Sequence, residues 1–262
     1  MRSRRREVVA GVETVVHLGA AHTAASAEML AIARAGPWID DVLVWSPPTT
    51  RAGLLAGLLG DPSGSDGGVL DRARGRIAIR AAEADRDGAS AILLVEPRLL
   101  GTPRESLALA RLYPTARARL VRASHALPPI RRAILTIRSP AAWWGSALAS
   151  AVARGAPLPD KATRSAIARG RRGWRDVVED LTKALPDAER IVQVPDGDAA
   201  DHAAAIFFTP TQRAAMAARH RADLDWLAAG AGGAARLWTL PAGPPNPHPI
   251  RDGGRDGRRH QT

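Results

Sequence analysis

Short apolar runs separated by helical stretches are the feature that most constrains the fold of this chain. The clearest run is Ala-Ile-Leu-Leu-Val at residues 91–95, which is apolar at every position and too short for a helix, as is typical of a strand buried on both faces. Similar runs lie at 13–18, 41–45, 133–137 and 190–194, and 236–240 is a candidate for a last strand. Because helical segments separate these runs, we predict an α/β fold of three layers, a mainly parallel central sheet with helices on both faces.

The helical segments are recognised by apolar residues three or four positions apart. We expect helices over residues 26–35, 51–59, 70–87, 106–112, 115–124, 174–185 and 211–228, and one more that Pro140 opens. Proline suits the first turn of a helix, where its missing N–H has no partner to lose.

The length of 262 residues is sufficient for one sizeable α/β domain with a well-buried core. We assign this domain to residues 13–240. Residues 1–12 form a basic N-terminal segment that we expect to be mobile, because it has little to bury. Residues 241–262 are rich in proline and glycine, and we expect a disordered tail.

The composition excludes several classes of chemistry. The chain has no cysteine, which excludes disulfides, thiolate metal sites and cysteine nucleophiles. We expect no metal site. The longest uncharged stretch, residues 139–153, is too short to span a bilayer, and no secretory signal is visible at the start. We therefore expect a cytoplasmic protein without a membrane partner.

The positive charge of the chain suits a ligand that carries phosphate groups. The formal net charge is +11, and part of it lies in the arginines of the two ends. Nucleic-acid binding usually combines basic patches with aromatic stacking residues, but aromatic residues are only 4% of this chain. A basic, nucleic-acid-associated protein that uses its tails is thus the less favoured alternative.

The first strand ends in a turn that can hold a phosphate. Residues 17–26 read His-Leu-Gly-Ala-Ala-His-Thr-Ala-Ala-Ser, a strand end, a glycine turn and a helix start that carries hydroxyl groups. The backbone N–H groups of such a helix start point at an anion. The Walker A pattern is not present, because it ends in Gly-Lys-Ser/Thr. A capped helix after a strand, without any ligand, is the alternative interpretation.

A second turn follows the strand at 133–137. Arg138 stands at its end, and Ser146 comes eight residues later, about two helical turns on. A guanidinium fork and a hydroxyl can share one phosphate group. Alternatively, the arginine pairs with a carboxylate and the serine faces a neighbouring helix. Since ligands bind at the carboxyl ends of parallel strands, these two turns are the candidate site.

Taken together, these segments resemble the sulfotransferase family, especially its bacterial sulfotransferase-like members. In that family the first loop is of the type His-Ile-Gly-x-His-Lys-Thr-Gly-Thr-Thr and binds the 5′-phosphosulfate of the donor, 3′-phosphoadenosine-5′-phosphosulfate (PAPS). The later Arg-x-Pro-x-x-x-x-x-Ser element binds the donor's 3′-phosphate and matches Arg138, Pro140 and Ser146 in spacing. Weaker similarities lie at 96–101, 112–114, 174–186 and 222–227.

The resemblance implies a function and a set of site residues. The expected function is PAPS binding and sulfate transfer to a hydroxyl or amine of an unidentified small-molecule or saccharide acceptor. The residues implied to bind the donor are Gly19, His22, Thr23, Ser26, Arg138 and Ser146.

The chain departs from the family pattern where the sulfuryl group would be transferred. His22 replaces the lysine that stabilises the leaving oxygen, Ala24 replaces a glycine, and Ala25 replaces a hydroxyl donor. Next to a phosphate an imidazole is shifted toward its charged form, so His22 can partly replace the lysine. Glu96, at the end of the strand 91–95, is either a general base or the ion-pair partner of an arginine. A catalytically silent nucleotide-binding protein therefore remains an alternative to an active sulfotransferase.

Overall fold

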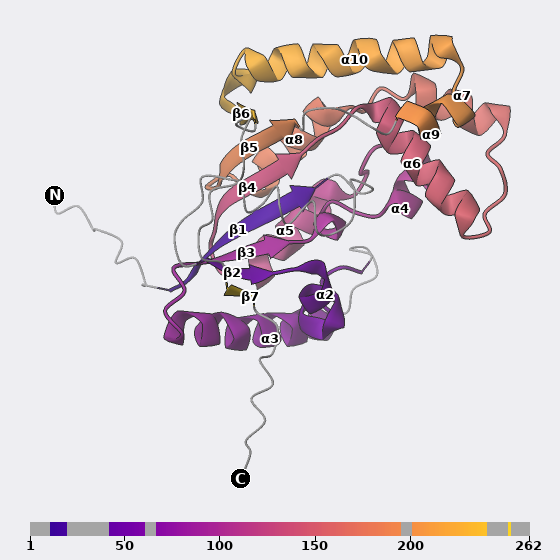
Figure 1. Ribbon diagram of the computed structural model, residues 1–262. Helices are drawn as coiled ribbons and strands as arrows, with labels where there is room; N and C mark the ends of the chain where they lie inside the picture. The colour runs from indigo at the N-terminus through magenta and orange to yellow at the C-terminus, as the bar shows by residue number, and fades with distance from the viewer. Residues whose placement is uncertain (1–10, 20–41, 61–66, 195–200, 240–250, 253–262) are drawn as a thin grey trace.

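A seven-stranded sheet with every strand pair parallel forms the centre of the protein (Figure 1). The computed structural model describes residues 11–19, 42–60, 67–194, 201–239 and 251–252. In spatial order the strands run β6-β5-β4-β1-β3-β2-β7. Their bounds are β1 Glu13–Gly19, β2 Val42–Trp45, β3 Ala91–Val95, β4 Ile130–Thr136, β5 Glu189–Val194, β6 Arg236–Thr239 and β7 Arg251–Asp252. The predicted α/β fold with a parallel sheet is confirmed.

Helices follow the strands as the sequence indicated, with some differences in extent. The α-helices of the described ranges are α2 Pro47–Thr49, α3 Gly67–Arg86, α4 Pro103–Leu109, α5 Ala116–Ala126, α6 Pro140–Ala153, α7 Lys161–Arg169, α8 Trp174–Ala184, α9 Asp201–Phe207 and α10 Pro210–Ala228. Short helical turns are the π-helical η1 Thr50–Leu54 and the 3₁₀ turns η3 Pro97–Leu99 and η4 Ala231–Gly233. The sequence pattern did not predict α7 or α9.

Two of the expected elements need comment. The helix expected over 51–59 is replaced by η1 and turns, because Gly53 adopts a φ of 127°, which interrupts regular helical geometry. The helix expected at 26–35 lies outside the described residues. The sequence predicts a disordered tail over residues 241–262, but the structure has a short strand there, β7, which pairs with Leu43 and Val44 of β2.

Local sequence explains where several helices begin. Thr102 and Glu105 form a reciprocal capping box at the start of α4, and Thr209 and Gln212 form another at the start of α10. Ser139 caps α6 by accepting a hydrogen bond from the Ala142 N–H. In each case proline occupies the first helical position, where its fixed φ suits the helix.

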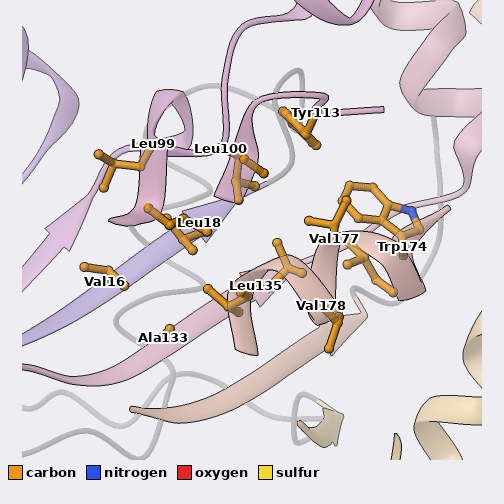
Figure 2. Packing of buried hydrophobic residues seen from close by; sticks show 14 of the residues in the cluster. Val16, Leu18, Leu99, Leu100, Tyr113, Ala133, Leu135, Trp174, Val177 and Val178 are labelled. Carbon is orange, nitrogen blue, oxygen red and sulfur yellow. The ribbon is translucent and has the colours of Figure 1, made fainter. Parts of the chain in front are cut away.

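Both faces of the sheet are buried, as a three-layer arrangement requires. On one face Val16 and Leu18 of β1 pack with β4 residues toward Val177 and Val178 of α8 (Figure 2). The connections that contain α3, α5 and α8 share this apolar cluster, since right-handed crossovers that run in one direction along a sheet lie on one face. Alternate residues point the other way and form a second buried cluster: Val15, Val42, Val44, Ala91, Leu93, Val95 and Ile134.

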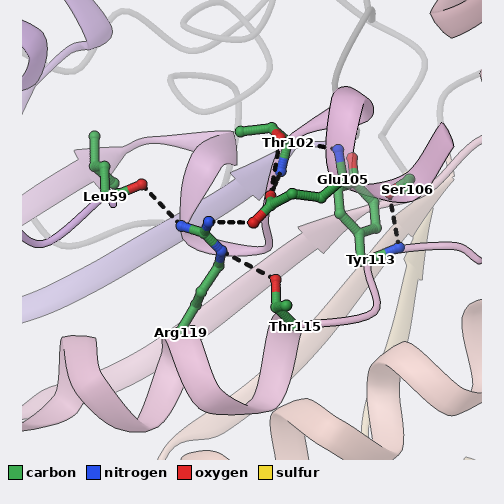
Figure 3. Close-up of polar contacts among 7 residues, drawn as sticks. All are labelled: Leu59, Thr102, Glu105, Ser106, Tyr113, Thr115 and Arg119. Atoms are coloured by element: carbon green, nitrogen blue, oxygen red, sulfur yellow. Dashed lines mark hydrogen bonds and ion pairs between the residues drawn. The ribbon is translucent and has the colours of Figure 1, made fainter. Parts of the chain in front are cut away.

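A buried arginine joins the segment after β2 to the two helices that follow β3 (Figure 3). The side chain of Arg119 on α5 is 4% exposed and forms an ion pair with Glu105 of α4. Its Nη1 donates to the Leu59 carbonyl at 2.8 Å, and its Nε donates to Thr115 Oγ1 at 3.1 Å. Burial raises the pKa of Glu105, but hydrogen bonds from Arg119 and Thr102 outweigh this effect and hold the pKa below its ordinary value.

We expect Arg119→Ala to lower the free energy of unfolding by about 3 kcal/mol, because it removes the cation paired with Glu105 and the donor to the Leu59 carbonyl. The matched control is Arg131→Ala. Arg131 is also paired with a carboxylate, that of Glu13, but both side chains are exposed, so its loss should cost less than about 1 kcal/mol. Urea unfolding of both variants measures the difference, and equal losses would contradict this account of Arg119.

Candidate functional site

The strands that precede the two turns singled out in the sequence end side by side at one edge of the sheet. β1 and β4 are neighbours, and Gly19 pairs in register with Thr136, two positions before Arg138. From β1 the chain runs toward one end of the strand order, to β2, whereas from β4 it runs toward the other end, to β5. Adjacent strands whose connections depart in opposite directions leave a crevice at their carboxyl ends, and ligands of open α/β sheets bind there. The candidate site therefore lies beyond Gly19 and Thr136.

Arg138 stands at this edge on a firmly held backbone. The Ile137 N–H donates to the Gln193 carbonyl at 2.9 Å, which extends the pairing of β4 with β5 by one residue. The Arg138 carbonyl accepts a hydrogen bond of 2.7 Å from Trp174 Nε1. Arg138 itself is only 6% exposed. The backbone of Arg138 is therefore firmly fixed at the strand end.

Ser146 is carried by the helix that starts at the same edge. It lies six residues after Pro140 in α6, about 9 Å along the helix axis, and it is half-buried. Gly19, Arg138 and Ser146 thus belong to elements that begin or end at the carboxyl edge. Three of the expected donor-binding residues, His22, Thr23 and Ser26, lie outside the described residues.

Glu96 also lies at this edge, and its carboxylate is fully engaged. Its N–H donates to the His17 carbonyl at 3.3 Å, so it adjoins β1. The side chain is completely buried, and both oxygens accept two hydrogen bonds each: Oε1 from Arg51 Nη2 and the Arg98 N–H, Oε2 from Arg51 Nε and Thr50 Oγ1. Of the two interpretations of Glu96 that the sequence left open, these contacts favour the ion pair with an arginine.

Thr50 and Arg51 are the residues of this edge that sequence reasoning missed. They follow β2, whose carboxyl end lies at the same edge as those of β1 and β3. Arg51 reaches Glu96 through a bidentate pair with distances of 3.0 and 3.1 Å. The available signal was an arginine in the turn after a predicted strand, but Arg51 comes six positions after the strand at 41–45, whereas Arg138 follows its strand directly.

A second buried polar group lies on the sheet beside the site. His17 Nε2 is 3.1 Å from Thr136 Oγ1 and 3.4 Å from Gln193 Oε1, and Thr136 donates to the same Gln193 oxygen at 3.1 Å. Since both neighbours can accept, Nε2 carries the proton. Among the described residues Nδ1 has no hydrogen-bond partner. Burial lowers the pKa of His17 to about 4, against the smaller opposing effect of the Gln193 hydrogen bond, so this is a neutral core histidine.

Two other kinds of feature are absent from the described ranges. Among these residues no group of three or more histidine, aspartate or glutamate side chains is arranged to hold a metal ion. No helix in the same ranges combines the length and apolar character needed to cross a membrane.

No protein-family model, no curated protein and no solved structure matches the chain.

The buried neutral state of His17 predicts a loss of stability in mild acid. Its pKa of about 4 in the folded protein lies below the ordinary value of 6.5. Between these values the unfolded chain binds more protons, so the free energy of unfolding falls as the pH drops from about 6.5 to 4, by roughly 3 kcal/mol in total. His17→Gln should remove this part of the pH dependence.

The control for this experiment is His125→Gln, because His125 is exposed on α5. Urea unfolding at a series of pH values measures the slope for wild type and both variants. The assignment would be wrong if His17→Gln kept the wild-type slope, or if His125→Gln flattened it equally.

Proposed function

We propose that this protein binds PAPS at the carboxyl edge of β1 and β4 and transfers its sulfuryl group to an unidentified hydroxyl or amine acceptor. The single observation that supports this best is the position of the two strand ends side by side. Gly19 ends β1, Arg138 follows β4, and the strands are paired in register at Gly19 and Thr136. The sequence resemblance assigns these turns to the two phosphate-bearing ends of one donor.

The chemistry of Arg138 fits the role of a 3′-phosphate ligand. A guanidinium offers a planar fork of donors that matches phosphate oxygens and stays charged at all relevant pH values. The buried location of Arg138 lowers the local dielectric, so a charge-assisted hydrogen bond to phosphate is stronger there than on an open surface. The half-buried hydroxyl of Ser146 on α6 would supply an additional donor to the same group.

In the proposed reaction an acceptor oxygen or nitrogen attacks sulfur, while the bond between sulfur and the bridging oxygen of the donor breaks. The proton of the acceptor passes to water, and the other products are the sulfated acceptor and adenosine 3′,5′-bisphosphate. Negative charge develops on the bridging oxygen, where a cation stabilises the transition state. In this chain the cation at the position of the family's loop lysine would be a protonated His22.

One specific observation favours a second candidate, a catalytically silent nucleotide-binding protein. Glu96 is the acidic residue at the strand end that the sequence offered as general base. Its two oxygens already accept four hydrogen bonds, two of them from Arg51. A carboxylate held this way is poorly placed to accept a proton from an acceptor hydroxyl.

Arg138→Ala should weaken binding of adenosine 3′,5′-bisphosphate by roughly tenfold to a hundredfold, because hydrogen bonds to a charged group contribute about 1.5–3 kcal/mol. Isothermal titration calorimetry gives the dissociation constants. The matched control is Arg122→Ala: Arg122 is buried to a similar degree, but its guanidinium donates to the Gly57 carbonyl instead. Its loss should leave the affinity unchanged. If the wild type fails to bind the bisphosphate, the proposal is wrong for both candidates.

His22→Lys should raise the rate of any sulfuryl transfer about tenfold or more, while bisphosphate affinity changes little, because charge at the bridging oxygen acts mainly in the transition state. The measurement is transfer of radiolabelled sulfate from PAPS to a panel of phenols, alcohols, amines and sugars. His22→Lys combined with Ala24→Gly tests whether the loop's alanine limits the gain.

The same assay separates the two candidates. Bisphosphate binding without transfer by wild type or either variant supports the silent binder. Transfer that is faster in wild type than in His22→Lys would contradict the role given to position 22.

A further inference from the structure

Arg51 is a half-exposed cation held in one orientation by a buried carboxylate. Its side chain is 38% exposed, whereas that of Glu96 is completely buried. Nε and Nη2 both donate to Glu96, which fixes the plane of the guanidinium. Among the contacts of the described residues none involves Nη1. The edge of the guanidinium that faces away from Glu96 therefore keeps hydrogen-bond donors available to a ligand.

Positive side-chain charge also exceeds negative charge around Glu96. Arg98 contributes its backbone N–H to Glu96, and its own side chain is exposed. Arg51 is the ion-pair partner of Glu96, whereas Arg98 contributes a neutral N–H, so the charge of the Arg98 side chain leaves a net positive charge beside the carboxyl ends of β2 and β3. Thr50, the fourth contact of the carboxylate, is neutral and buried.

The backbone that carries Arg51 is irregular. Residues Thr50–Leu54 form a π-helical turn that contains Gly53 at a φ of 127°. Single π-helical turns are rare and occur frequently at functional sites. Here the turn places both Thr50 and Arg51 against the carboxylate of Glu96, which lies 46 and 45 positions further along the chain.

We propose that Arg51 is a binding residue for the acceptor and that the acceptor carries an anionic group, a carboxylate, sulfate or phosphate, close to the atom that is sulfated. This inference rests on the proposed function for the location of the site. The strand order supports a role in binding the acceptor rather than the donor. Because β3 lies between β1 and β2, Arg51 approaches Glu96 from the side opposite the β1–β4 crevice, where the donor is proposed to bind. Glu96 is then a positioning residue, which holds the guanidinium ready for the anion and lowers the entropy cost of binding it.

The test compares two ligands of the same shape that differ in charge. 4-Hydroxybenzoate and 4-hydroxybenzamide are titrated by calorimetry into the full-length protein, with and without saturating adenosine 3′,5′-bisphosphate. The wild type should bind the carboxylate at least about tenfold more tightly than the amide, and Arg51→Gln should lose this preference. Bisphosphate affinity should be the same in both proteins.

Two further variants keep the experiment interpretable. Arg51→Lys retains the charge and should keep part of the preference, even if Arg51→Gln disturbs the buried Glu96. Thr50→Val removes one donor to Glu96 without changing charge, and it should keep the full preference. Thermal unfolding of each variant verifies that it is folded.

The outcomes separate this inference from the proposed function. Equal affinity for the two ligands in wild type, no binding of either, or a preference that survives in Arg51→Gln would overturn it and leave Arg51 as a structural ion pair only. If the bisphosphate does not bind but the charge preference is present and depends on Arg51, the anion site stands and the proposed donor fails.

Discussion

β1 is the strand on which the rest of the molecule depends, because it pairs with β3 on one side and with β4 on the other. These two ladders align Gly19, Glu96 and Arg138 at one edge, although the residues come from distant parts of the chain. The pairing is stabilised from both faces, since alternate residues of β1 enter the two separate apolar clusters. Loss of this strand would separate Arg138 and Ser146 on one side from Arg51 and Glu96 on the other.

Polar side chains are buried in the same region, next to a largely apolar interior. Glu96, His17, Thr136 and Gln193 are all fully buried or nearly so. Burial of such groups costs free energy unless each finds a partner, and most of their polar atoms do. The exceptions, His17 Nδ1 and Gln193 Nε2, have none among the described residues. A fold that concentrates this cost at the ligand edge of its sheet is consistent with a functional site there.

Many arginine side chains of the described residues form hydrogen bonds within the protein. Guanidinium groups donate to main-chain carbonyls at the ends of helices and turns; the arginines concerned include Arg76, Arg119, Arg122, Arg172, Arg190 and Arg219. Such carbonyls would otherwise lack a donor. A formal net charge of +11 therefore overstates the cationic surface available to a polyanion. This observation weighs against the nucleic-acid alternative and leaves Arg51 and Arg138 as the arginines with the clearest functional placement.

The sequence by itself determined the fold class and pointed to the sheet edge at which the candidate site lies. Runs such as 91–95 and 133–137 are apolar over a strand's length, and a parallel sheet collects the residues that follow them at one edge; the strands at 13–18 and 190–194 followed from the same pattern. Tertiary structure alone decided which side chains meet at that edge. Arg51 and Glu96 are 45 positions apart, and their contact depends on the strand order and on an irregular turn at Gly53. Local patterns are set by short-range sterics and burial, whereas ion-pair partners are chosen by topology, which no local pattern specifies.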